Sequence, residues 1–166
     1  MRRAAGPTLA DMDYAELFER QGLLMDDLLL HAFKVPQDRF VAPGEGGAPS
    51  LRDLLVEWIE MQRRTVHASI QERPYVPLPA AGMATVPDVA RAFGGFRLTL
   101  LEVLDGVFAE SLTKKVTWTG PGGAARDSTL DEVLAHLVLH GARMMGLVAQ
   151  RLRQLGETPP PTDLLV

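Results

Sequence analysis

The fold is decided by residues 128–155, S-T-L-D-E-V-L-A-H-L-V-L-H-G-A-R-M-M-G-L-V-A-Q-R-L-R-Q-L. Apolar residues recur there at three- and four-residue steps, which is the period of an amphipathic helix. Thr129 with Glu132 three residues later predicts a capping box at its start, and Gly156 predicts its end. His136 and His140 are four residues apart, so they share one helix face. They are close enough to hold one metal ion or to bracket one ligand if that face borders a cavity.

Three further segments show the same helical period, over about residues 11–34, 50–71 and 87–108. Residues 112–119, L-T-K-K-V-T-W-T, are rich in β-branched side chains and precede the turn Gly120-Pro-Gly-Gly123, which predicts a short strand or hairpin arm. Four amphipathic helices bury their apolar faces by packing together. We therefore expect an all-α, up-and-down-type four-helix bundle in a single domain of residues 1–166. A small β arm is expected between its third and fourth helices.

The composition excludes several classes of protein. The chain has no cysteine, so any metal must be bound by His, Asp, Glu or water. A net charge of −4 and the lack of a long basic run argue against a nucleic-acid partner. The sequence shows neither a signal-peptide pattern nor a window of about 20 apolar residues, so we expect a cytoplasmic protein without a membrane span.

The chain resembles the DinB-like superfamily, including its YfiT-type bundles. The features that carry the resemblance are Pro49-Ser-Leu-Arg-Asp-Leu-Leu55, Phe93-Gly-Gly-Phe-Arg-Leu-Thr99, Val116-Thr-Trp118, and Thr129-Leu-Asp-Glu-Val-Leu-Ala-His136 followed by Gly156-Glu-Thr-Pro-Pro160. The resemblance implies a homodimer and a divalent ion, such as Zn, Ni or Mn, at the centre of the bundle. It also implies a transferase, isomerase or hydrolase of small molecules that is thiol-dependent in some branches.

This chain departs from the family's metal-binding pattern. The pattern resembles H-x-x-x-H-x-x-x-H-R-G-Q on the fourth helix, with one more histidine on the second helix. His136 and His140 match its first two histidines, but Met144 replaces the third, and Glu57 stands where the second helix usually carries a histidine. A neutral thioether is a poor ligand for Zn, Ni or Mn. The metal site implied by the resemblance is therefore degenerate here.

Two interpretations of these residues remain open. In one, Glu57, His136 and His140 form a facial triad around a divalent ion with open positions for water or substrate, as in a metal-dependent enzyme. In the other, no metal binds, and His140 is a core histidine bonded to Glu57 or to a backbone carbonyl. The bundle is then non-catalytic, or it binds a small-molecule ligand in a cavity lined by Trp58, Met61, Met144 and Leu147. We favour the second interpretation.

The phase of each helix predicts how far these side chains are buried. His140 lies within the apolar stripe of its helix and is expected to be buried, whereas His136 lies on the neighbouring boundary stripe. Glu57 is expected to be semi-buried. The basic residues Arg143, Arg151 and Arg153 are interpreted as a solvated face that complements the helix dipole, with a site for phosphate or an acidic ligand as the alternative.

Overall fold

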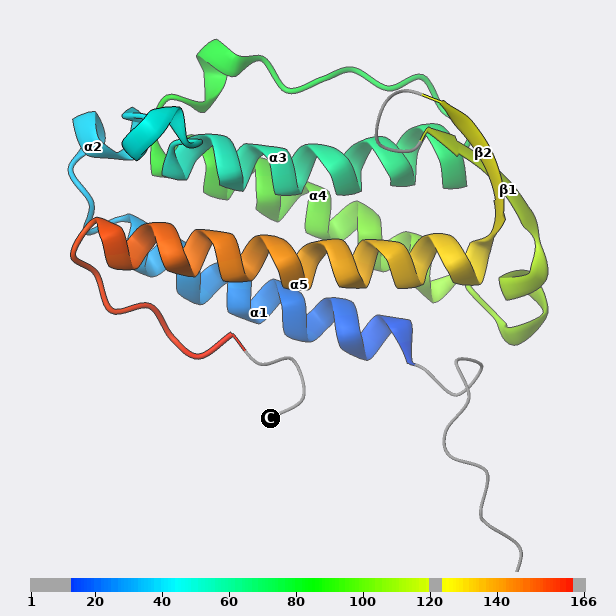
Figure 1. Cartoon of the computed structure of the whole chain (residues 1–166). Helices are drawn as coiled ribbons and strands as arrows, with labels where there is room; N and C mark the ends of the chain where they lie inside the picture. Colours follow the sequence, from blue (N-terminus) through cyan, green and yellow to red (C-terminus); the bar gives the residue numbers. More distant parts are fainter. Residues whose placement is uncertain (1–12, 120–123, 163–166) are drawn as a thin grey trace, which may run out of the picture.

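Four long helices pack together in the computed structural model, which describes residues 13–119 and 124–162 (Figure 1). A short helix, α2 (Gln37–Val41), follows the first long helix, and an antiparallel hairpin of β1 (Lys115–Thr119) and β2 (Ala125–Thr129) joins the last two. The long helices are α1 (Tyr14–Ala32), α3 (Leu51–Arg64), α4 (Val86–Asp105) and α5 (Leu130–Gln154). The four-helix bundle and the small β arm are thus confirmed. The predicted turn at residues 120–123 lies outside the described residues.

Side chains cap the start of each long helix. The side chain of Asp13 accepts from the Glu16 N–H at the start of α1. Capping boxes begin α3, α4 and α5, formed by Ser50 with Asp53, Thr85 with Asp88, and Thr129 with Glu132. Such caps contribute about 1 kcal/mol each, so the local sequence defines where the helices begin. The box at Thr129 agrees with the sequence analysis.

The directions of the helices follow from two apolar clusters at opposite ends of the bundle. One cluster joins the C-terminal halves of α1 and α5 to the N-terminal halves of α3 and α4, and the other joins the opposite halves. Consequently α3 and α4 run in the same direction, antiparallel to α1 and α5. The up-and-down order expected from the sequence is therefore not followed. Direction alternates from α1 to α3 and from α4 to α5, but between α3 and α4 the chain returns along the bundle through residues 71–85, the return segment (Figure 1).

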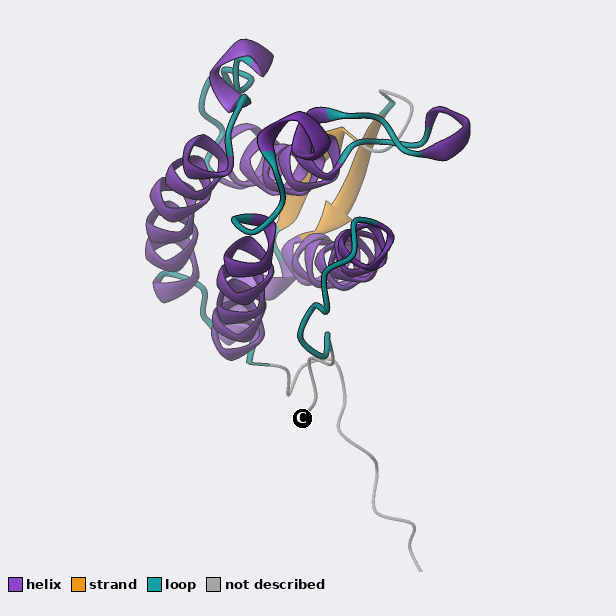
Figure 2. Ribbon diagram, turned by 90° about the vertical axis from the view of Figure 1, so that its left-hand side faces the viewer, coloured by secondary structure: helices purple, strands orange, loops and turns teal. Residues whose placement is uncertain are grey.

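Each of α4 and α5 packs against both α1 and α3. Figure 2 shows the long helices seen towards their ends, with the hairpin across the far end of the bundle. After Arg64, α3 continues into a π-helical turn, Thr65–Ile70, before the return segment begins. Glu72 then has a positive φ of 54°, which is a helix-ending conformation.

The core is apolar apart from a small polar link between three helices. Gln21 on α1 is 2% exposed and donates to the carbonyl of Val138 on α5 at 2.7 Å. Gln62 on α3 in turn donates to Oε1 of Gln21 at 3.3 Å. Buried polar groups are tolerated when they are hydrogen-bonded, so this link fixes the relative positions of α1, α3 and α5.

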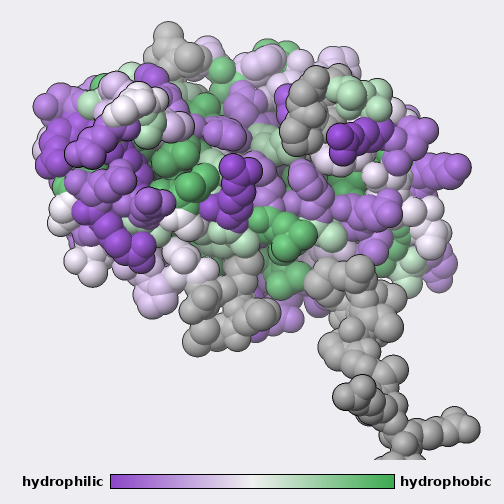
Figure 3. Space-filling view, viewed as in Figure 1, coloured by the Kyte–Doolittle hydropathy of each residue, from purple (hydrophilic) through white to green (hydrophobic). Residues whose placement is uncertain are grey.

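Helix α5 combines length with a long apolar window. It contains an 18-residue window with a mean hydropathy of 1.2, so by length and composition alone it could cross a membrane, although the sequence analysis expected no such window. Half of that window is buried against the rest of the bundle, as in the core helix of a soluble protein. On the face seen in Figure 3, hydrophobic areas are interspersed with hydrophilic ones.

Candidate functional site

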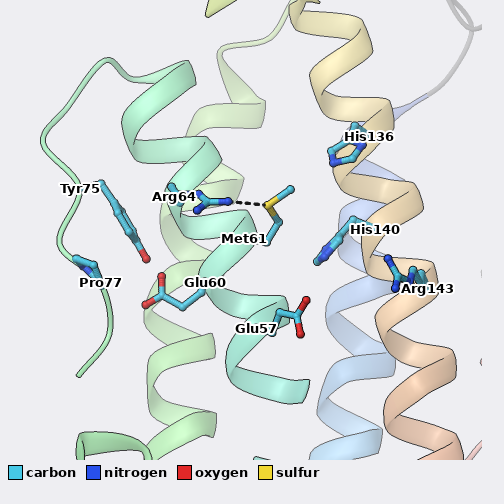
Figure 4. Close-up of a pocket in the computed structure, with 9 residues that line it drawn as sticks. All are labelled: Glu57, Glu60, Met61, Arg64, Tyr75, Pro77, His136, His140 and Arg143. Atoms are coloured by element: carbon cyan, nitrogen blue, oxygen red, sulfur yellow. Dashed lines mark hydrogen bonds between the residues drawn. The ribbon is translucent and has the colours of Figure 1, made fainter. Parts of the chain in front are cut away.

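A cavity lies between α3, α5 and the return segment. Its volume is about 690 Å³. Figure 4 shows the side chains that line it, which are Glu57, Glu60, Met61, Arg64, Tyr75, Pro77, His136, His140 and Arg143. The structure thus places all three predicted metal ligands, Glu57, His136 and His140, around one cavity.

The two helices contribute matching stripes to this cavity. Each stripe has the spacing i, i+4, i+7, which keeps three side chains on one helix face. The stripes are Glu57, Met61 and Arg64 on α3, and His136, His140 and Arg143 on α5. Because α3 and α5 are antiparallel, Glu57 lies towards the Arg143 end of the cavity and Arg64 towards the His136 end (Figure 4).

The two imidazoles lie near each other and are partly shielded from water. Their ring centroids are 6.4 Å apart, with the planes inclined by 32°. His136 also packs against Trp118 of β1 at a centroid distance of 4.8 Å. Within the described residues, Nε2 of His136 and Nδ1 of His140 are buried and have no hydrogen-bond partner. Each ring therefore has one buried nitrogen that is unsatisfied among the described residues.

Both imidazoles are neutral near pH 7. The pKa of His140 is lowered to about 4. Burial is the largest cause, and the charges of protonated His136 and of Arg143 add to it. Burial and the charge of Arg126 lower the pKa of His136 from its usual value of 6.5. A neutral imidazole can donate one hydrogen bond and accept another, and it can also bind a metal.

The return segment is fastened over α3 by polar contacts. The N–H of Leu78 donates to the carboxylate of Glu60, and Arg63 lies 4.0 Å from that same carboxylate. The guanidinium of Arg63 also lies over the ring of Tyr75, 5.7 Å from its centroid. Tyr75 and Pro77 thereby form the outer wall of the cavity (Figure 4).

Several expectations about burial need correction. Glu57 is exposed rather than semi-buried, because its position on α3 faces the open cavity instead of the core. His140 is only half-buried, since it too lines the cavity. Because Nδ1 of His140 has no partner and Glu57 makes no hydrogen bond within the described residues, the expected bond between them is not formed.

Of the four side chains predicted to line a cavity, Met61 lines the one between α3 and α5. Trp58 and Met144 are each 1% exposed and belong to the apolar core, and Leu147 is partly buried against that core. These three side chains lie on helix faces that turn inward to the other helices, away from the cavity between α3 and α5.

The predicted solvated basic face is wrong for one of its three members. Arg143 and Arg153 are exposed, but Arg151 is 9% exposed. Its guanidinium donates to the carbonyl of Ala42 at 3.1 Å and to Oε1 of Gln154 at 3.2 Å. Arg151 thus attaches the segment after α2 to the end of α5.

Glu57, His136 and His140 are the side chains that would have to bind a divalent ion in this cavity. Residues 13–119 and 124–162 contain no group of three His, Asp or Glu side chains close enough to hold one. Structural and catalytic zinc sites use at least three protein ligands. The two imidazoles suit a metal chemically, but Glu57 does not complete a triad in this geometry, and Met144 is buried elsewhere.

Part of the chain is similar in sequence to a known protein family. A family model matches residues 99–166, from the middle of α4 through the hairpin and α5. These residues belong to the DinB family. The DinB match includes both cavity histidines and Arg143, whereas Glu57, Met61 and Arg64 on α3 lie outside it. No curated protein sequence matches the chain.

The sequence analysis did not assign Arg64, Tyr75 or Trp118 to the site. Arg64 follows Glu57 by seven residues, so the helical period was a usable signal for it. Tyr75 comes from the return segment, and Trp118 reaches His136 from β1. No local pattern relates either residue to α5, so only the tertiary structure brings them there.

Proposed function

We propose that this DinB-type bundle is a non-catalytic protein that binds a small molecule in the cavity between α3 and α5. The observation that carries the proposal is the pair of cavity-lining imidazoles, each with a buried nitrogen that lacks a partner within the described residues. A buried polar atom without a partner costs about 1–3 kcal/mol. A ligand that bonds to these nitrogens would recover that free energy, so the site suits a bound polar group.

The shape and lining of the cavity support the same proposal. Ligand pockets usually have volumes of roughly 300–1,000 Å³ and combine apolar walls with a few polar groups. This cavity has a volume of about 690 Å³. Met61, Tyr75 and Pro77 offer apolar surface, while charged side chains and the two histidines offer polar contacts.

A metal-dependent transferase, isomerase or hydrolase of small molecules, in one form thiol-dependent, is the second candidate. It is favoured by the position of Glu57, His136 and His140 around one cavity and by the low pKa values that keep both imidazoles neutral. An ion there would activate water or a thiol by lowering its pKa. The candidate requires Glu57 to approach the histidines more closely than it does in this structure.

The binding proposal is tested with three probes of similar shape and different charge: benzamide, benzoate and benzylammonium. The imidazole signals of the full-length protein are followed by ¹H–¹⁵N NMR during titration. At least one probe should shift the signals of His136 and His140 to saturation and leave His31 and His67 unchanged. Met61→Trp, which fills the cavity, should abolish the shifts. The proposal fails if none of the three probes gives a saturable shift.

The metal candidate is separated by elemental analysis of untagged protein. Our proposal expects Zn, Ni and Mn contents well below one ion per chain, even after incubation with micromolar metal. Near-unit stoichiometry that is lost in Glu57→Gln and retained in Glu60→Gln would instead establish the Glu57, His136 and His140 site. The homodimer and the cytoplasmic location stay predictions.

A further inference from the structure

We propose that the ligand of this cavity carries a carboxylate, which is attracted by the guanidinium groups of Arg64 and Arg143. This inference rests on the proposed small-molecule function and specifies the chemical class of the ligand. It comes from the charges that surround the cavity and from which of them are already paired.

The glutamates of the cavity differ in how far they are neutralised. Glu60 accepts from the Leu78 N–H and lies 4.0 Å from Arg63, so its charge is offset within the protein. Glu57 forms no ion pair among the described residues. Glu57 is therefore the one lining carboxylate, within the described chain, whose charge is not offset locally.

Neither lining arginine is paired with a carboxylate in the described structure. Among the described residues, the one hydrogen-bond acceptor of the Arg64 guanidinium is the thioether of Met61, at 3.4 Å, and a thioether is a weak acceptor. Arg143 takes part in none of the ion pairs or hydrogen bonds within residues 13–119 and 124–162. Two unpaired arginines and one unpaired glutamate leave a surplus of one positive charge, which matches a singly charged anion better than a phosphate dianion or a cation.

The positive charge surrounds the histidines in particular. Arg126 disfavours protonation of His136, and Arg143 disfavours protonation of His140, as does His136 when it is itself protonated. Glu57, across the cavity on α3, does not cancel this effect. An anion would thus enter a region of positive potential with two neutral imidazoles, each of which can donate an N–H.

The two arginines approach the cavity from opposite walls. Arg64 projects from α3 and Arg143 from α5, with the cavity between the helices (Figure 4). Guanidinium groups bind carboxylates through two parallel N–H···O bonds, which also fix the orientation of the ligand. The apolar part of the ligand would then lie against Met61, Tyr75 and Pro77.

The test compares affinities for benzoate, benzamide and benzylammonium by calorimetry and by the histidine NMR signals. Benzoate should bind at least tenfold more tightly than benzamide, and benzylammonium most weakly. Arg64→Gln and Arg143→Gln should each lower benzoate affinity about tenfold and leave benzamide affinity unchanged. Arg153→Gln, an exposed change on the same helix but outside the cavity, should have no effect. Circular dichroism establishes that the variants are folded.

Equal binding of benzoate and benzamide would overturn this inference and leave the proposed binding function in place. Preference for benzylammonium would overturn it as well and would indicate that Glu57 dominates the site. Failure of all three probes would overturn both proposals. The ratio of benzoate affinity to benzamide affinity in the unmodified protein tests the carboxylate proposal even if an arginine variant does not fold.

Discussion

Trp118 packs against His136, with their ring centroids 4.8 Å apart and the ring planes inclined by 48°. Trp118 is 8% exposed, and its Nε1 donates to Oγ of Ser128 on the neighbouring strand at 3.1 Å. The indole is thus held by the hairpin while it covers a histidine of α5. The β arm therefore supports a cavity-lining histidine and also links two helices.

Trp118→Ala should expose His136 and destabilise the protein. Burial is the main cause of the lowered pKa of His136, so the variant should raise this pKa towards 6.5. Loss of the buried indole should lower the free energy of unfolding by roughly 2–4 kcal/mol. An NMR pH titration and urea denaturation measure the two effects. Phe108→Ala, at a side chain that is 67% exposed, should change neither, and an unchanged His136 pKa in Trp118→Ala would contradict the role of the indole.

Acid should destabilise the protein through His140. Its folded-state pKa of about 4 is below the unfolded value of 6.5, so the unfolded state binds more protons between these pH values. The neutral ring's contribution is complete above pH 6.5 and is lost as the pH falls towards 4. Because the ring is only half-buried, solvent screening limits the loss to roughly 1–2 kcal/mol.

His140→Leu tests this assignment. The variant should be at least as stable as the parent protein at pH 7, because an unpartnered polar nitrogen is replaced by an apolar group. It should also lose part of the decline between pH 6.5 and 4, with the remainder arising from His136. Urea denaturation at several pH values measures both effects, and an unaltered pH profile would contradict the prediction.

Two glycines of α5 should respond oppositely to the same substitution. A Cβ at Gly141 would lie 2.4 Å from Oε1 of Gln21, whose amide is buried and bonded to Val138. Gly141→Ala should break this polar link and lower the free energy of unfolding by about 1–3 kcal/mol. A Cβ at Gly146 meets nothing within 4 Å, so Gly146→Ala should gain up to about 1 kcal/mol from helix propensity. Thermal unfolding compares them, and equal shifts in Tm would contradict the role of Gln21.

Two arginines near the end of α5 should also differ. Arg151 is buried and donates to Ala42 and Gln154, whereas Arg153 is exposed. Arg151→Gln should remove charged hydrogen bonds and cost about 1.5–3 kcal/mol. Arg153→Gln should stay within about 0.5 kcal/mol of the parent protein in the same denaturation experiment. Similar costs for the two variants would show that the buried contacts of Arg151 do not stabilise the fold.

Local sequence patterns account for the helices, for the capping box at Thr129 and for the two histidines that face one cavity. Helical period and capping are properties of neighbouring residues, so Ser50, Thr129 and the His136–His140 spacing could be interpreted locally. The second strand, Ala125–Thr129, was not identified, because A-R-D-S-T lacks a run of apolar or β-branched residues.

Tertiary packing sets which surface each of these residues contacts. The return segment makes α3 and α4 run in the same direction, and the bundle then leaves Glu57 exposed and buries Arg151. It also brings Arg64 and Arg143 to opposite walls of one cavity and seats Trp118 on His136. These relationships depend on the packing of segments that are distant in the chain, and the helical period constrains only which residues share a face.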